Sequence, residues 1–166
     1  MTSETTIGSR VVGPGRVSHL DATLGPVMRP LRNELVARVL AAHEPFGLRM
    51  GALSALGVIS ERPGCSQQDL VNWLVLDKST IVAIIDQLET RGLARRERSL
   101  SDRRRNGLFI TPEGDALMRE MLEQVLRVEA TIRAALGEQE FGRLVGLLNR
   151  AYAALLADGA ASAQGQ

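Results

Sequence analysis

The stretch SQQDLVNWLVLDKSTIVAIIDQLETRGLARRERSLSDRRRNGLFITPEG, residues 66–114, decides the fold of this chain. Its first part predicts a short helix over 66–74. Ser66 is a suitable N-cap for this helix, because its side-chain oxygen can accept a hydrogen bond from a free backbone N–H of the first turn. Asp69 stands three residues later, as in a weak capping box. A tight turn then leads to Asp77, which can cap a further helix.

The second helix is expected over 78–91. Its apolar residues recur at helical spacing and form one stripe, made of Ile81, Ile84, Ile85 and Leu88. Gly92 follows at the position where many helices end in a left-handed residue. Two short helices joined by a tight turn are typical of a helix-turn-helix.

The chain beyond Gly92 changes character, because 93–98 and 107–110 each have the composition of a short strand. The polar segment 99–106 lies between them, so the two strands form a hairpin with a basic tip. Thr111 and Pro112 then give a strong helix start, with Thr as N-cap and Pro at the first helical position. A helix-turn-helix followed by such a hairpin is a winged helix-turn-helix.

Helices are also expected on both sides of this stretch. We expect them over 31–43, 48–61, about 112–136 and about 138–157, with Gly137 as the break between the last two. Pro26 and Pro30 either bound the first helix or kink its first turns. The long terminal helices are apolar on more than one side, so they can pack on their own domain and on a second copy.

The composition of the whole chain limits its function. The 166 residues carry a net charge of +1, so any nucleic-acid surface must be local. A single cysteine excludes an intramolecular disulfide and a cysteine-rich zinc site, and it suits a reducing cytosol. We expect a cytoplasmic protein without a membrane span or a secretory signal. The termini, 1–17 and 158–166, have the composition of flexible arms.

Positive charge is concentrated in one segment. Residues 91–105 contain seven arginines and two acidic residues, which leaves +5 on this segment and −4 on the rest of the chain. Such an asymmetry is typical of a surface that faces DNA. Arginine also suits a narrow minor groove, whose negative potential attracts it.

The ordered set of motifs resembles the MarR family of bacterial transcriptional regulators. The resemblance covers about 66–114 and includes DKST from Asp77, the segments IDQLE and RGL, DRR from Asp102, and LFITPEG from Leu108. It implies a mainly α fold, with a winged helix-turn-helix over about 48–111, a two-stranded β-wing, and dimerisation helices over about 18–45 and 112–157. It further implies a homodimer that binds near-palindromic double-stranded DNA. Many members of the family release DNA when a small, often aromatic and acidic, molecule binds.

The residues expected to contact DNA lie on the second helix and on the wing tip. On the helix they are Lys78, Ser79, Thr80, Val82, Ala83 and Gln87. Lys78 and Ser79 would contact phosphates, whereas Val82 and Ala83 could contact thymine methyl groups or pack inside the domain. On the tip, Arg104 would enter the minor groove, Asp102 would orient it, and Arg103 and Arg105 would reach phosphates.

The resemblance places an effector between the dimerisation helices and the winged domain. Candidate residues are Arg32, His43, Phe46, Arg49 and Met50, which would suit an organic acid such as an aromatic carboxylate or a thioester. The alternative for these residues is ordinary surface charge and core packing.

Other functions stay open at this point. The protein could be a regulator that needs no ligand, or a winged-helix interaction module whose basic wing meets an acidic partner. We expect no enzyme, because no catalytic constellation is present, and no metal site or cofactor, because His19 and His43 are too few and too scattered. Cys65 is expected to fill a small apolar gap, with a redox switch as the less favoured reading. Trp73 lies beside the apolar stripe of its helix and has no assigned role.

Overall fold

The computed structural model describes residues 23–98 and 106–164, so the N-terminal arm and the wing tip lie outside the described residues. By their contacts the residues form two compact units, Met1–Arg38 and Val39–Gln166. The first helix, α1 (Leu24–His43), begins earlier than expected and includes Pro30. Because proline lacks a backbone N–H, one backbone hydrogen bond of the helix is not formed there.

Three short helices follow: α2 (Ala52–Glu61), α3 (Gln67–Leu74) and α4 (Lys78–Thr90). The helix predicted over 48–61 starts only at Ala52, and a 3-10 turn, η2 (Glu44–Phe46), precedes it. Positive φ angles at Gly47 and Gly51 explain the late start, since helical residues need negative φ.

The predicted caps of α3 and α4 are confirmed. Ser66 and Asp69 form a reciprocal capping box, and Asp77 accepts a hydrogen bond from the Thr80 backbone N–H at 2.8 Å. Gly92, with φ 67°, ends α4 in a Schellman arrangement, because its N–H donates to the Glu89 carbonyl and the next N–H donates to the Leu88 carbonyl.

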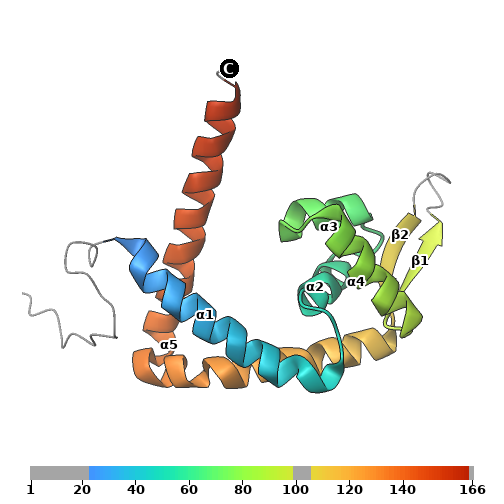
Figure 1. The fold of residues 1–166 in the computed structure, drawn as a ribbon, viewed down its shortest axis with the longest axis horizontal. Helices are drawn as coiled ribbons and strands as arrows, with labels where there is room; N and C mark the ends of the chain where they lie inside the picture. Colours follow the sequence, from blue (N-terminus) through green and yellow to red (C-terminus); the bar gives the residue numbers. More distant parts are fainter. Residues whose placement is uncertain (1–22, 99–105, 165–166) are drawn as a thin grey trace, which may run out of the picture. The chain divides into compact units, whose positions relative to one another are not determined.

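The wing is an antiparallel pair of strands, β1 (Ala94–Arg98) and β2 (Asn106–Ile110), in which Ala94 lies opposite Ile110. This confirms the predicted hairpin. The backbone of Gly64 and Cys65 adds a short bridge to β2, with the Leu108 N–H donating to the Cys65 carbonyl at 2.8 Å. Figure 1 shows α4 and the wing at one end of the unit Val39–Gln166.

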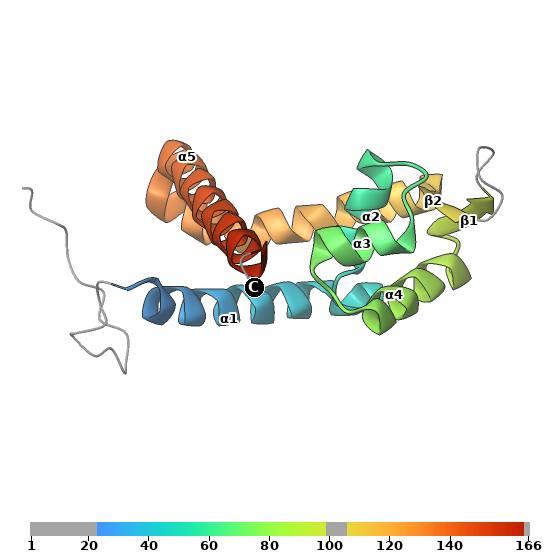
Figure 2. The ribbon, with the colours of Figure 1, turned by 90° about the horizontal axis from the view of Figure 1, so that it is seen from above.

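The last helix, α5 (Pro112–Gln164), is two helices separated by a kink at Gly137, as predicted. Thr111 caps it, since its hydroxyl accepts a hydrogen bond from the Gly114 N–H at 3.0 Å. The helical backbone continues to Gln164, past the expected end near residue 157. Figure 2 shows the part after the kink leaving in a new direction.

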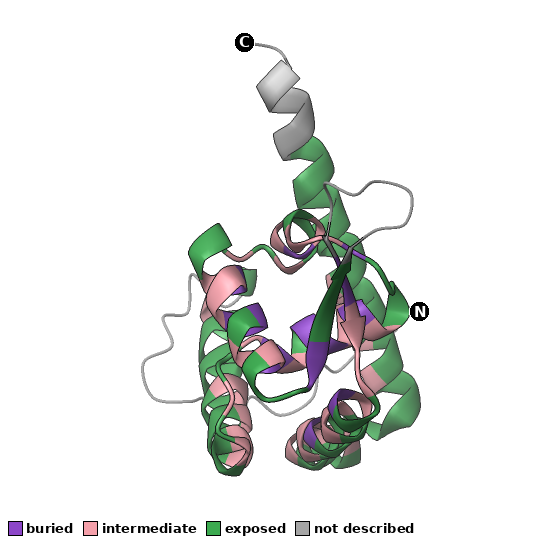
Figure 3. Cartoon of the chain, turned by 90° about the vertical axis from the view of Figure 1, so that its right-hand side faces the viewer, coloured by how far each residue is buried: buried purple, intermediate pink, exposed green. Residues whose placement is uncertain are grey.

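The core lies where α2, α3, α4, the wing and the start of α5 meet (Figure 3). Its largest fully buried side chains include the predicted stripe of α4, and they are Leu56, Ile59, Leu70, Ile81, Ile84, Ile85, Leu88 and Leu108. Cys65 is buried among them, and burial raises the pKa of its thiol, an environment that disfavours a reactive thiolate. The part of α5 beyond the kink is mostly exposed.

Candidate nucleic-acid interface

Helix α4 presents two different faces, and the residues predicted to contact DNA divide between them. Lys78 and Val82 line an open hollow between α3, α4 and the wing, of about 620 Å³. Ser79, Thr80 and Ala83 line a second groove, of about 740 Å³, together with Arg49 and Met50. Residues four positions apart share a helix face, which explains why Lys78 and Val82 lie together.

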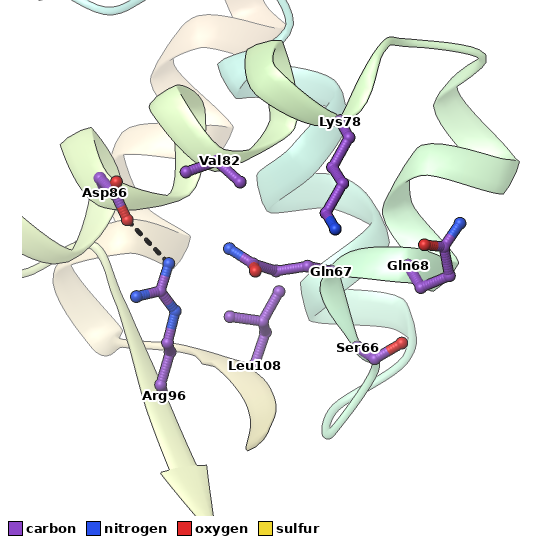
Figure 4. A pocket seen from close by; sticks show the side chains of 8 residues that line it. All are labelled: Ser66, Gln67, Gln68, Lys78, Val82, Asp86, Arg96 and Leu108. Carbon is purple, nitrogen blue, oxygen red and sulfur yellow. Dashed lines mark hydrogen bonds and ion pairs between the residues drawn. The ribbon is translucent and has the colours of Figure 1, made fainter. Parts of the chain in front are cut away.

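Figure 4 shows the hollow with the eight side chains that line it: Ser66, Gln67, Gln68, Lys78, Val82, Asp86, Arg96 and Leu108. The start of α3 supplies the first three, α4 the next three, and the wing the last two. The Gln67 side-chain nitrogen is buried here and makes no hydrogen bond among the described residues. The sequence pattern does not reveal Gln67, Gln68 and Arg96 as members of this site, because their convergence depends on how α3 and the wing pack against α4.

An ion-pair cluster closes one end of the hollow. Arg96 of β1 reaches across to α4, where its Nη2 lies 2.8 Å from Asp86 Oδ1 and its Nη1 lies 2.9 Å from Glu89 Oε2. The Arg96 backbone N–H also donates to Glu89 Oε1 at 3.2 Å. The wing and α4 are therefore joined by three polar contacts of one residue.

The N-terminus of α4 is held by a dense cap. Asp77 accepts from the Thr80 hydroxyl at 2.6 Å and from the Ser79 hydroxyl, in addition to the backbone N–H. These hydrogen bonds hold the pKa of the Asp77 carboxyl well below its usual range. The hydroxyls of Ser79 and Thr80 are thus already donors to Asp77, although each can still accept a hydrogen bond.

Gln87 has partners within the protein that the sequence did not predict. Its amide nitrogen donates to the Gly47 carbonyl at 3.0 Å, and its amide oxygen accepts from the Arg49 N–H at 2.9 Å. In the same way, Arg91 donates to the Phe46 carbonyl. The Gln87 side chain of α4 and the Arg91 side chain at its C-cap therefore bind the segment 46–49, and the Gln87 amide is engaged inside the protein.

The candidate effector residues of the unit Val39–Gln166 fall into two groups. His43 Nε2 lies 3.0 Å from the Met121 carbonyl oxygen, and the rings of His43 and Phe46 meet edge to face at 5.8 Å. Arg49 and Met50 line the groove beside α4 instead. Arg32 is exposed on α1.

The remaining predicted residues can be placed briefly. Asp102, Arg103, Arg104 and Arg105 lie outside the described residues, so their roles stay predictions. Trp73 is partly exposed, and the Arg62 guanidinium lies 4.5 Å from its ring centroid. Within the described ranges, no group of three or more potential metal ligands is present, and none of the helices is long and apolar enough to cross a membrane.

Comparisons with known proteins agree with this geometry. A family model described as the MarR family matches residues 46–105. A protein of Thauera aromatica, assigned as a transcriptional regulatory protein for the hcr operon, is 38% identical over 116 residues, which are 70% of this chain and 69% of that protein.

Two solved structures are similar along most of the chain. The transcriptional repressor CouR, bound to a 23-mer DNA duplex, has a TM-score of 0.74 at 28% identity and covers 82% of this chain and 97% of its own. A MarR family protein of Mycobacterium tuberculosis, in complex with p-aminosalicylic acid, has a TM-score of 0.64 at 26% identity. The match covers 77% of this chain and 99% of that protein.

Proposed function

Because the chain belongs to the MarR family of transcriptional regulators, we propose that it is a homodimeric repressor that binds a near-palindromic DNA operator. The hollow between α3, α4 and the wing carries this proposal. It brings Lys78 and Val82 of α4 to one open surface with the wing, whose tip sequence is the most basic segment of the chain. The DNA-bound repressor CouR, which shares the fold, supports the assignment.

Each element has a role in this proposal. Helix α4 enters the major groove, where Lys78 meets a phosphate and Val82 contacts a thymine methyl group. The wing tip follows the backbone into the adjacent minor groove, with Arg104 oriented by Asp102, and with Arg103 and Arg105 on phosphates. Gln87 stays a candidate DNA contact, although one N–H and the oxygen of its amide already bind the segment 46–49.

The test is a DNA-binding titration at several salt concentrations. The wild-type protein enriches duplexes from a random 30-base-pair library, and the enriched duplex is compared with a scrambled one of equal length. We expect the enriched duplex to bind at least about a thousandfold more tightly, with a steep salt dependence from phosphate contacts. Equal affinity for both duplexes contradicts the proposal and favours the alternative, an interaction module that binds an acidic partner.

We further propose that a small organic acid releases the protein from DNA. The groove lined by Arg49, Met50 and Ala83 supports this, because it places a cationic side chain beside apolar ones on the flank of α4. The related protein in complex with p-aminosalicylic acid shows such a molecule bound to a similar fold. His43 and Phe46 lie in contact with each other, and Arg32 stays a candidate from sequence alone.

A panel of aromatic acids and their thioesters tests the ligand proposal. An effector should weaken operator binding at micromolar to millimolar concentration, and Arg49→Ala should reduce that response while leaving DNA affinity without ligand close to wild type. If no compound changes either the melting temperature or the DNA affinity, the protein is a regulator that needs no ligand.

A further inference from the structure

The two elements proposed to contact DNA, α4 and the wing, are joined by the side chain of Arg96. Its guanidinium uses one nitrogen for Asp86 and the other for Glu89, two carboxylates that lie three residues apart on the same helix. Figure 4 shows the Arg96–Asp86 contact crossing one end of the hollow. The side chains of Arg96 and Glu89 are 32% and 27% exposed, so this part of the cluster is half-buried.

The charge of Arg96 is matched within the protein. One guanidinium faces two carboxylates, so the cluster as a whole is acidic although it borders a surface that faces DNA. An arginine whose charge is already neutralised by carboxylates of the free protein releases few counterions when the protein binds DNA. Its contribution to binding must therefore come from geometry and not from charge.

We propose that Arg96 is a positioning residue for DNA recognition, which fixes the orientation of the wing relative to α4. This inference rests on the proposed DNA-binding function. A protein that reads a base in one groove and places arginines in the next needs both contacts in register. Contacts to phosphate alone tolerate misalignment, since the phosphates repeat along the duplex. Loss of the Arg96 link therefore affects discrimination between sequences more than affinity for DNA in general.

Arginine is required for this role because of its shape. Its planar guanidinium offers two separate donor edges and can hold two carboxylates at once, whereas a lysine ammonium is a compact point charge. The neighbouring Arg95 provides a matched control. Its side chain pairs with Glu97 of the same strand and lies 5.7 Å from the Phe109 ring centroid, so it does not bridge the wing to α4.

The experiment compares Arg96→Lys with Arg95→Lys, two variants that keep the net charge. Each is titrated against the duplex enriched by the wild type and against the scrambled duplex, at three or more salt concentrations. For Arg96→Lys we expect the ratio of the two affinities to fall at least about fivefold, which is the loss of a specific contact. Its affinity for scrambled DNA, its salt slope and its melting temperature should match the wild type. Arg95→Lys should behave like the wild type throughout.

Two results overturn the proposal. One is an unchanged affinity ratio in Arg96→Lys. The other is an equal loss of affinity for both duplexes with a lower salt slope, which would make Arg96 an ordinary phosphate contact. A wild type that does not distinguish the two duplexes would instead contradict the proposed function itself.

Asp86→Asn provides a second measurement in which Arg96 itself is not substituted. It removes one carboxylate, so electrostatics alone predicts tighter binding to both duplexes. If Arg96 positions the wing, the ratio of the affinities for the enriched and the scrambled duplex should instead fall, although the variant carries more positive charge. Tighter binding to both duplexes at an unchanged ratio overturns the proposal even if Arg96→Lys fails to fold.

Discussion

Val75 forms the turn between α3 and α4 in a conformation that a β-branched residue rarely adopts. Its φ of 52° and ψ of 42° lie in the left-handed region, and it is the one non-glycine residue with positive φ among those the structure describes. Its side chain is 73% exposed, so little burial compensates for the strain. The helix-turn-helix therefore has a locally unfavourable residue at its centre.

The first prediction follows from this strain. Val75→Gly should raise the free energy of unfolding by about 1 kcal/mol, because the relief of left-handed strain exceeds the entropy that glycine adds to the unfolded chain. Chemical denaturation at fixed protein concentration measures the difference. Val71→Gly is the control, since it places the same substitution inside α3 at a half-buried position, where it should lower stability. If Val75→Gly is less stable than the wild type, the Val75 side chain stabilises the protein by more than its left-handed backbone destabilises it.

The second prediction concerns pH. The pKa of Asp77 is lowered in the folded protein, so its carboxylate stabilises the fold above the unfolded pKa of about 3.9. This stabilisation is lost as the pH falls through the lower folded value. Asp77→Asn keeps a good N-cap but removes the charge. It should therefore be less stable than the wild type at neutral pH, and the difference should shrink steadily as the pH falls below about 4. Denaturation curves between pH 7 and pH 2 measure it, and a difference that does not change with pH would contradict the assignment.

The residues that sequence analysis placed correctly are those with local partners. The Ser66–Asp69 and Asp77–Thr80 contacts each span three residues, so sequence spacing alone reveals them. The Arg96–Asp86 pair and the Gln87–Gly47 contact depend on tertiary packing, which spacing does not show. Helical periodicity gives the face of α4 on which Gln87 lies, but not the segment 46–49 that its amide binds.

At the scale of elements, one glycine marks the position where the start of α5 meets the chain next to the wing. A Cβ on Gly114 would lie within 3 Å of the Leu93 carbonyl group, so the start of α5 approaches the wing too closely for any side chain. A Cβ on Gly142, farther along α5, would meet nothing within 4 Å. The same helix thus contains one glycine fixed by packing and one that has no such constraint.

The third prediction compares these two positions. Gly114→Ala should destabilise the protein by about 2 kcal/mol or more, because the backbone of the wing must move away. Gly142→Ala should stabilise it by about 0.5–1 kcal/mol, since alanine has the higher helix propensity. Thermal melts of both variants measure the effects. Equal effects at the two positions would contradict the close approach of Gly114 to Leu93.

Element boundaries show why prediction from sequence succeeds in part. The break at Gly137 and the start at Pro112 were predicted, because Gly and Thr-Pro have strong local preferences. The apolar pattern predicted α1 only from residue 31, whereas the helix begins at Leu24, so of the two alternatives for Pro30 the one that bounds the helix is wrong. The wing tip carries the most conspicuous sequence motif, but its residues 99–105 are not among those described, so its geometry stays a prediction.

At the scale of the whole molecule, the second half of α5 exposes more apolar surface than a lone chain favours. Beyond the kink its exposed large residues are Val145, Leu147, Tyr152, Leu155 and Leu156. Most of them lie on one stripe with the half-buried Leu148, since positions 145, 148, 152 and 155 alternate steps of three and four. A contiguous apolar stripe of this kind marks an association surface. The proposed second copy covers it, because a twofold interface brings the same stripe from both chains together.

The last prediction tests this dimer through charge placed on the stripe. The double variant Val145→Glu, Leu155→Glu should be monomeric at micromolar concentration, because each glutamate would lie in an apolar contact and face like charges across the twofold axis. Ala154→Glu, on the opposite side of the helix, should stay dimeric. Light scattering measures the oligomeric state.

Val145 and Leu155 are both exposed in the single chain, so the double variant should keep its core and its helical content, as circular dichroism can check. A monomer contacts only one half-site, and the loss of the second should lower operator affinity at least about a hundredfold while random DNA loses less. A double variant that remains dimeric would place the interface elsewhere on the chain.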